Sequence, residues 1–147
     1  MEAIIGVIVG AALGLVGAYF QNRWSDKRNA IERKAEYYTN ILGHLSTLRF
    51  CNWAFLREET EGLPYSNEYR EELMKLNHEA KIRVEQADAT GDVYMPKEAA
   101  ESLHAVLRVW SNSTPESYYD DLETTAKVVN TAITNIVQAA KNDLKVK

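Results

Sequence analysis

Few side chains in this sequence have the types and spacing that chemistry requires. The three histidines are His44, His78 and His104, and Glu101 precedes His104 by three residues. Glu-x-x-His pairs bind two metal ions in helical bundles, but only when a second pair and further carboxylates face the first. Neither of the other two histidines has a glutamate three residues before it. The sequence therefore predicts no metal site and no cofactor.

The single cysteine, Cys51, lies between Phe50 and Trp53 in a segment with helical periodicity. A reactive thiol needs a positively charged or helix N-terminal setting, and this segment offers neither. We therefore predict a buried structural cysteine. The chain also lacks the glycine-rich phosphate loop, the dinucleotide fingerprint and the G-x-S-x-G nucleophile motif. The expected function is non-enzymatic.

The apolar segment Ala3–Phe20 contains eighteen residues without a charge. At about 1.5 Å per helical residue it spans roughly 27 Å, close to the ~30 Å hydrocarbon core of a bilayer. A cleaved signal peptide is the alternative, but no basic residue precedes the segment. We therefore predict a transmembrane helix in contact with the lipid bilayer. Its predicted interface residues are Tyr19, Phe20, Arg23, Trp24, Lys27 and Arg28.

All seventeen basic residues follow this segment. Because Lys and Arg gather on the cytoplasmic side of a membrane, we expect a single-pass protein of the cell inner (cytoplasmic) membrane, with its N-terminus outside and its C-terminal domain in the cytosol. Small residues repeat every four positions along one side of the segment, a pattern that lets membrane helices pack closely. The predicted oligomerisation or pore-forming residues are Gly6, Gly10, Gly14 and Ala18.

Apolar residues at helical spacing predict four helices beyond the span, over residues 24–61, 67–89, 96–110 and 115–144. The boundary signals are Gly62 and Pro64 after the first helix, Ser66 or Asn67 at the start of the second, a loop at Thr90–Asp92, and Pro96 before the third. In the last helix the predicted buried seam is Leu122, Ala126, Val129, Ile133, Ile136 and Ala140.

Short connections between such helices are typical of antiparallel bundles. The predicted fold is all-α: one N-terminal transmembrane helix over residues 3–20 continues into an up-down-up-down four-helix cytosolic bundle over residues 21–147. Between Glu58 and Glu123 there are sixteen acidic and six basic residues. Because nucleic-acid binding needs a contiguous basic face, no nucleic-acid partner is expected.

The Gly-rich span, the basic exit and the helical domain together resemble small prokaryotic defence membrane proteins, such as the single-pass accessory membrane proteins of type VI-B CRISPR systems. The resemblance implies a homo-oligomeric pore with a HEPN-like helical domain that depolarises infected cells. HEPN ribonucleases carry an arginine a short distance before a histidine, but here Arg70 precedes His78 by eight positions. Ribonuclease activity is therefore not expected.

Two functions stay open at this point. The first is a homo-oligomeric membrane effector in antiviral defence, which forms a pore or perturbs the membrane. The second is a membrane-tethered adapter whose acidic bundle recruits a cytosolic protein partner.

Overall fold

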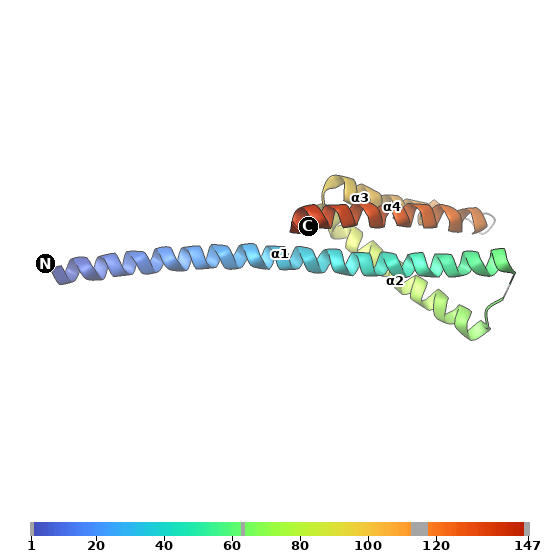
Figure 1. The fold of residues 1–147 in the computed structure, drawn as a ribbon, viewed down its shortest axis with the longest axis horizontal. Coiled ribbons are helices and arrows are strands. Elements are labelled where there is room, and N and C mark those ends of the chain that lie inside the picture. The colour runs from blue at the N-terminus through green and yellow to red at the C-terminus, as the bar shows by residue number, and fades with distance from the viewer. Residues whose placement is uncertain (1, 63, 113–117, 146–147) are drawn as a thin grey trace. The chain divides into compact units, whose positions relative to one another are not determined.

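The computed structural model describes residues 2–62, 64–112 and 118–145. Within the helices, the side chains of residues 2–22, 24 and 118–120 are not described. The described residues form four α-helices, and the predicted all-α class is confirmed (Figure 1). These are α1 (Glu2–Glu61), α2 (Asn67–Tyr94), α3 (Lys97–Asn112) and α4 (Tyr118–Leu144). The chain divides into two units, Met1–Lys34 and Ala35–Lys147, and α1 contributes to both.

The first unit does not support the predicted transmembrane helix. Among the residues that the structure describes, no helix combines the length and the apolar character needed to cross a bilayer. The described side chains of this part of α1 are mostly charged or polar and solvent-exposed, including Arg23 and Lys27, and Arg28 pairs with Glu32 at 2.8 Å. The transmembrane part of the fold prediction is therefore wrong.

Four further predictions depended on that span: the single-pass topology, the orientation with the N-terminus outside, the inner-membrane localisation and the pore. Because no described helix can cross a bilayer, these predictions are wrong as well. The side chains of the glycine stripe (Gly6, Gly10, Gly14 and Ala18) and of Tyr19, Phe20 and Trp24 lie outside the described part of the chain.

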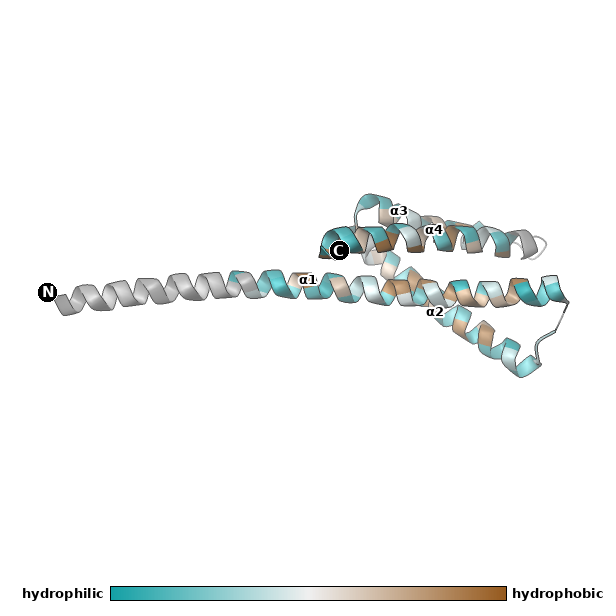
Figure 2. Ribbon diagram, viewed as in Figure 1, coloured by the Kyte–Doolittle hydropathy of each residue, from teal (hydrophilic) through white to brown (hydrophobic). Residues whose placement is uncertain are grey.

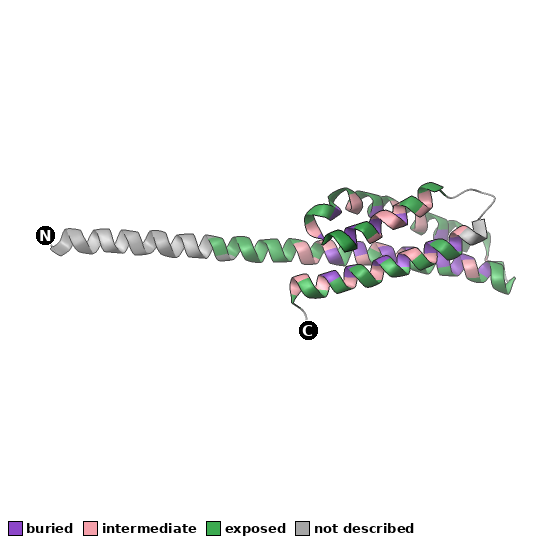
Figure 3. Ribbon diagram, turned by 90° about the horizontal axis from the view of Figure 1, so that it is seen from above, coloured by how far each residue is buried: buried purple, intermediate pink, exposed green. Residues whose placement is uncertain are grey.

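The second unit is a helical bundle, as the periodicity of the sequence predicts. From Ala35 onward, successive helices reverse direction, with hydrophobic and hydrophilic residues alternating along each helix (Figures 1 and 2). Buried residues lie on the sides of the helices that face one another (Figure 3). The largest fully buried side chains include Tyr38, Leu48, Leu103 and Ile136, which come from α1, α3 and α4. Burial of these apolar surfaces is the main force that holds the helices together.

A second, smaller cluster of buried side chains lies where α1 ends and α2 begins. Its members are Cys51, Ala54, Phe55, Leu73 and Leu122. The cysteine is fully buried, which confirms the prediction of a structural thiol. This cluster forms the support for the groove described below.

The buried seam of α4 differs in part from the predicted one. Leu122, Val129 and Ile136 are buried as expected, but the intervening core positions are Thr125, Ala132 and Ala139. The prediction chose the neighbouring residues 126, 133 and 140, which the structure leaves partly exposed. Small residues can face the bundle because they allow the helices to approach closely, and so Ala132 is buried while the larger Ile133 beside it is partly exposed.

The helix boundaries follow local backbone chemistry. Gly62 adopts a positive φ of 63°, the left-handed conformation that favours glycine after a helix. The hydroxyl of Ser66 accepts a hydrogen bond from the Tyr69 N–H at 3.2 Å and so caps α2. The predicted loop at Thr90–Asp92 is wrong, because α2 continues to Tyr94 with Gly91 buried inside it.

Candidate functional site

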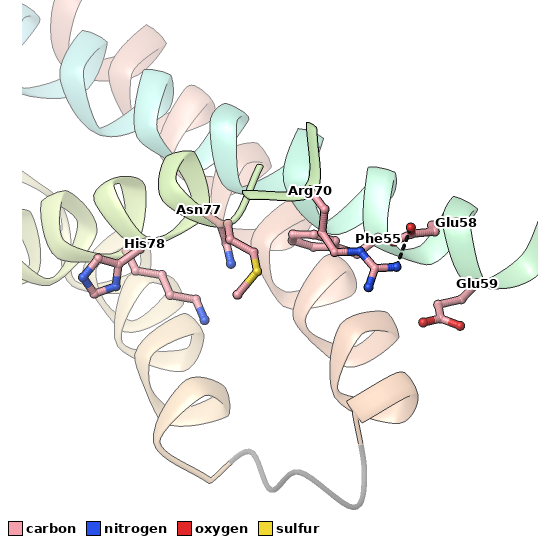
Figure 4. A pocket seen from close by; sticks show the side chains of 8 residues that line it. Phe55, Glu58, Glu59, Arg70, Asn77 and His78 are labelled. Atoms are coloured by element: carbon pink, nitrogen blue, oxygen red, sulfur yellow. Dashed lines mark hydrogen bonds and ion pairs between the residues drawn. The ribbon is translucent and has the colours of Figure 1, made fainter. Parts of the chain in front are cut away.

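An open groove of about 470 Å³ lies between α1 and α2 in the second unit. It is walled by side chains from one turn of α1 and three turns of α2, and Figure 4 shows them from close by. The lining residues are Phe55, Glu58 and Glu59 from α1 and Arg70, Met74, Asn77, His78 and Lys81 from α2. The α2 residues recur at three- and four-residue spacing, so that they share one face of that helix.

The floor of the groove is apolar and partly open to solvent. The ring of Phe55 is only 7% exposed, since it belongs to the small buried cluster, whereas Met74 remains 59% exposed. Beside them, the amide oxygen of Asn77 is buried without a hydrogen-bond partner among the described residues. A flexible thioether next to a fixed aromatic ring is an adaptable apolar surface.

One end of the groove is closed by an ion pair. Arg70 Nη2 lies 2.6 Å from Glu58 Oε1, and the Tyr65 N–H donates to the same carboxylate oxygen at 2.8 Å. The Glu58 side chain is only 7% exposed, in contrast to the 48% of Arg70. The hydrogen bond from Arg70, followed by that from Tyr65, lowers the pKa of the Glu58 carboxyl. The carboxylate is therefore held ionised and already has its partners.

The other end of the groove is formed by Lys81. Its ammonium nitrogen lies 5.3 Å from the centre of the Trp110 ring, a cation–π contact with α3. Burial lowers the pKa of Lys81, while the nearby charge of Glu85 acts in the opposite direction. Like Arg70, this cation is engaged within the chain.

A separate polar cluster lies between α1, α2 and α3. Tyr37 Oη donates to the Ala87 carbonyl at 2.9 Å, and the ring stacks on Tyr94 with centroids 4.9 Å apart. Burial, together with the charge of Asp88, raises the pKa of Tyr37 to about 12. A phenol held protonated in this way joins two helices and is unsuited to proton transfer at neutral pH.

His104 belongs to the edge of this cluster. Its Nδ1 lies 2.7 Å from Asp88 Oδ1, although the contact lacks the alignment of a hydrogen bond, and its Nε2 lies 4.0 Å from Asp92 Oδ1. Glu101, the other member of the Glu-x-x-His pair in the sequence, pairs with Lys97 at 3.6 Å. Among the described residues no three His, Cys, Asp or Glu side chains gather in a way that could hold a metal ion.

No family model, curated protein or solved structure matches this chain. The likeness to the accessory membrane proteins of type VI-B CRISPR systems therefore stays a prediction. What the chain does has to be inferred from the groove and from the surfaces around it.

The groove was not predicted from the sequence. Arg70, Met74 and His78 share one face of α2, and this four-residue repeat was the available signal. Tyr69 and Leu76 fall at helical spacing with the buried Leu73 and would be expected on the same face, but both are 38% exposed. Of the predicted membrane-interface residues, Arg23, Lys27 and Arg28 are exposed on the first unit, and the structure brings none of them to the groove.

Proposed function

We propose that this chain is a non-enzymatic adapter whose helical bundle recruits a protein partner through the groove between α1 and α2. The observation that supports this is the open apolar floor of Phe55 and Met74 between two helices, with an ion pair at one end and a cation–π contact at the other. An amphipathic helix can lay its apolar face into such a groove.

The chemistry of the partner follows from the surrounding charge. Arg70 is engaged by Glu58 and Lys81 by Trp110, so that the cations of the groove are already used within the chain. Between Glu58 and Glu123 the sequence carries sixteen acidic and six basic residues, and the whole chain has a net charge of −4. Complementary charge speeds association and selects among partners. The expected partner is therefore a basic amphipathic helix with an apolar anchor that packs on Met74.

A labelled peptide tests this proposal directly. The probe is a fluorescein-labelled amphipathic helix of leucine and lysine, titrated with the full chain and followed by fluorescence anisotropy. We expect saturable binding in the micromolar range. A peptide of the same pattern with glutamate in place of lysine should bind at least about tenfold more weakly, a difference of ~1.4 kcal/mol. Equal binding of the two peptides would show that the charge part of the proposal is wrong.

Two matched variants separate the groove from general acidity. Met74→Lys places a positive charge on the groove floor, while Val93→Lys adds the same charge at a site on α2 that is 77% exposed and lies outside the groove. We expect Met74→Lys to weaken binding of the lysine peptide by about tenfold or more and Val93→Lys by less than about threefold. If both variants weaken binding equally, the peptide recognises overall charge and the groove is not the site.

A further inference from the structure

The solvent-facing side of α1 in the second unit carries a regular seam of exposed residues. Its positions alternate in steps of four and three, the spacing of a coiled-coil seam. The seam consists of Thr39, Gly43, Ser46, Phe50, Trp53 and Arg57, all of which are exposed. The opposite side of the same helix, with Leu45 and Leu48, is already buried in the bundle. α1 therefore presents a second packing face that nothing in the described chain covers.

Two aromatic rings make this face costly to leave in water. Phe50 is 55% exposed and Trp53 is 64% exposed, although both lie on an ordered helix. The Arg57 guanidinium, 5.9 Å from the centre of the Trp53 ring, shields only part of that surface. Neighbouring exposed aromatic residues at seam positions mark an interaction surface more often than isolated apolar residues do.

The order of side-chain sizes along the seam identifies the partner. Two small residues, Gly43 and Ser46, are followed by two large ones, Phe50 and Trp53. We infer that this face of α1 pairs antiparallel with the same face of a second copy of the chain, about a two-fold axis level with Leu48. In that arrangement Trp53 packs over the second copy's Gly43, and Phe50 packs over the second copy's Ser46. Each large side chain then meets a small one, as dense packing favours, and each contact occurs twice about the axis, as in any isologous interface.

The space needed by the second copy is present at the glycine. A Cβ atom added at Gly43 would meet no atom within 4 Å in the chain, so the surface above it is open. A parallel pairing would instead place Phe50 against Phe50 and Trp53 against Trp53 and leave both small positions facing each other. The helices would then be held apart at one end and would leave a void at the other, which dense packing disfavours. The seam therefore favours the antiparallel pair.

This dimer goes beyond the proposed adapter function and does not depend on it. The groove uses Phe55 and Met74, whereas the seam lies on the other side of α1. The seam contributes two exposed rings per chain, which places the interface at the small end of specific contacts, and a dissociation constant in the micromolar range is expected.

The first experiment blocks the open position on the seam. Gly43→Leu fills the space over the glycine, and because its surroundings are open the folded chain should accept the side chain and keep or raise its thermal unfolding midpoint. We expect sedimentation equilibrium of the full chain to show dimerisation at least tenfold weaker than wild type. Asn130→Leu, which adds the same side chain to an exposed position of α4, is the control and should leave dimerisation unchanged. Undiminished self-association of Gly43→Leu would overturn the inference.

The second experiment tests the register, whichever other contacts the full chain makes. In the antiparallel seam Thr39 lies opposite the second copy's Arg57. A mixture of Thr39→Cys and Arg57→Cys chains should therefore be joined by a short bismaleimide, whereas neither variant alone should be. The native Cys51 is fully buried and should not react. Cross-linking of each single variant to itself, or no cross-linking of the mixture, would overturn the antiparallel pair.

A compensating double variant completes the test. Trp53→Ala in the Gly43→Leu background removes the ring that the new leucine would meet in the second copy. Dimerisation should then recover by at least about fivefold over Gly43→Leu alone, because the large and small positions of the layer are exchanged. A further loss of self-association in the double variant would contradict the predicted layer.

Discussion

Glu58 at the end of α1 and Arg70 at the start of α2 form an ion pair whose closest atoms, Oε1 and Nη2, are 2.6 Å apart. The Tyr65 N–H donates to the same Glu58 oxygen from the connection between the two helices. One carboxylate thus fixes both helix ends and the segment between them. Because these contacts form one end of the groove, they set the geometry in which a partner would bind.

Replacing this carboxylate should loosen the connection between α1 and α2. Glu58→Gln keeps the shape of the side chain and one acceptor oxygen but removes the charge that Arg70 faces, so the charge-assisted bond is lost. We expect the thermal unfolding midpoint to fall by several degrees, measured by circular dichroism at pH 7. Glu72→Gln, at an exposed position of α2, is the matched control and should shift the midpoint little. Equal shifts in the two variants would contradict a special role for Glu58.

The same carboxylate makes a distinct prediction for acidic pH. Arg70 lowers the pKa of Glu58 in the folded chain, so the stability that it contributes is fully present above the unfolded value of about 4.3 and is lost as the pH falls through the folded pKa. The difference in unfolding midpoint between wild type and Glu58→Gln should be constant at neutral pH. It should shrink as the pH is lowered below about 4. A difference that does not change with acidification would show that the charge of Glu58 is not the cause.

The raised pKa of Tyr37 predicts how the stability of the bundle changes at alkaline pH. Its pKa is raised from 10.0 to about 12, so the unfolded chain ionises first, and the contribution to stability is present below pH 10 and lost as the pH rises toward 12. Tyr37→Phe should cost about 1 kcal/mol at neutral pH, where the hydrogen bond to the Ala87 carbonyl is lost. It should also reduce the slope of stability against pH between 10 and 12, measured by urea denaturation.

The exposed Tyr69 supplies the control for the lost hydrogen bond, since Tyr69→Phe should lower the stability at neutral pH by less than Tyr37→Phe does. Tyr38 keeps part of the slope in both variants. Its phenol donates to Asp143 at 2.6 Å, and burial, together with that bond, raises its pKa. A Tyr37→Phe slope identical to that of wild type would contradict the prediction.

The four helices could be predicted from the sequence because their periodicity is local. Ser66 and Gly62 have the side-chain chemistry of a helix cap and a helix stop, and the structure uses both in that way. Thr90–Asp92 was misread as a loop, since glycine usually marks one. In the structure Gly91 is buried inside α2 beside Met95 and Tyr37, where little room remains for a side chain.

The groove and the transmembrane segment illustrate two different limits of sequence reasoning. The groove depends on which faces of α1 and α2 meet, and the charges of Glu58 and Arg70 give no hint of their partner across twelve positions of chain. The transmembrane prediction rested on the composition of one window, Ala3–Phe20, whereas among the described residues no helix is long and apolar enough to cross a membrane. In α4 the helical period was predicted correctly. Whether Ala132 or Ile133 faces the core could not be predicted, because that depends on how the neighbouring helices pack.

Cys51 should react only when the bundle opens. The thiol is fully buried, and burial raises its pKa, so both access and thiolate formation are suppressed. We expect labelling by a disulfide reagent at pH 8 to be at least about a hundredfold slower in the native chain than in guanidinium chloride. An added thiol at the exposed Thr60 should label rapidly in the native chain. Rapid stoichiometric labelling of the native wild type would contradict the described burial.

Gly91 and Gly43 offer a matched pair of helix glycines whose surroundings differ. Alanine favours a helix over glycine by about 1 kcal/mol, and Gly43→Ala should gain most of this because its added Cβ meets nothing within 4 Å. At Gly91 the new Cβ would lie 3.2 Å from Met95 Cε and 3.5 Å from Tyr37 Oη. The methionine end can move, so Gly91→Ala should gain less than about 0.5 kcal/mol.

A larger side chain at Gly91 separates packing from helix propensity. Gly91→Val would press branched methyl groups toward Tyr37 and Ala100, whose Cβ lies 4.0 Å from the added atom, and should cost about 1–3 kcal/mol. The measurement is urea denaturation of all three variants at low protein concentration, so that self-association does not contribute. Gly91→Val as stable as Gly91→Ala would show that the contact between α2 and Tyr37 is looser than its distances indicate.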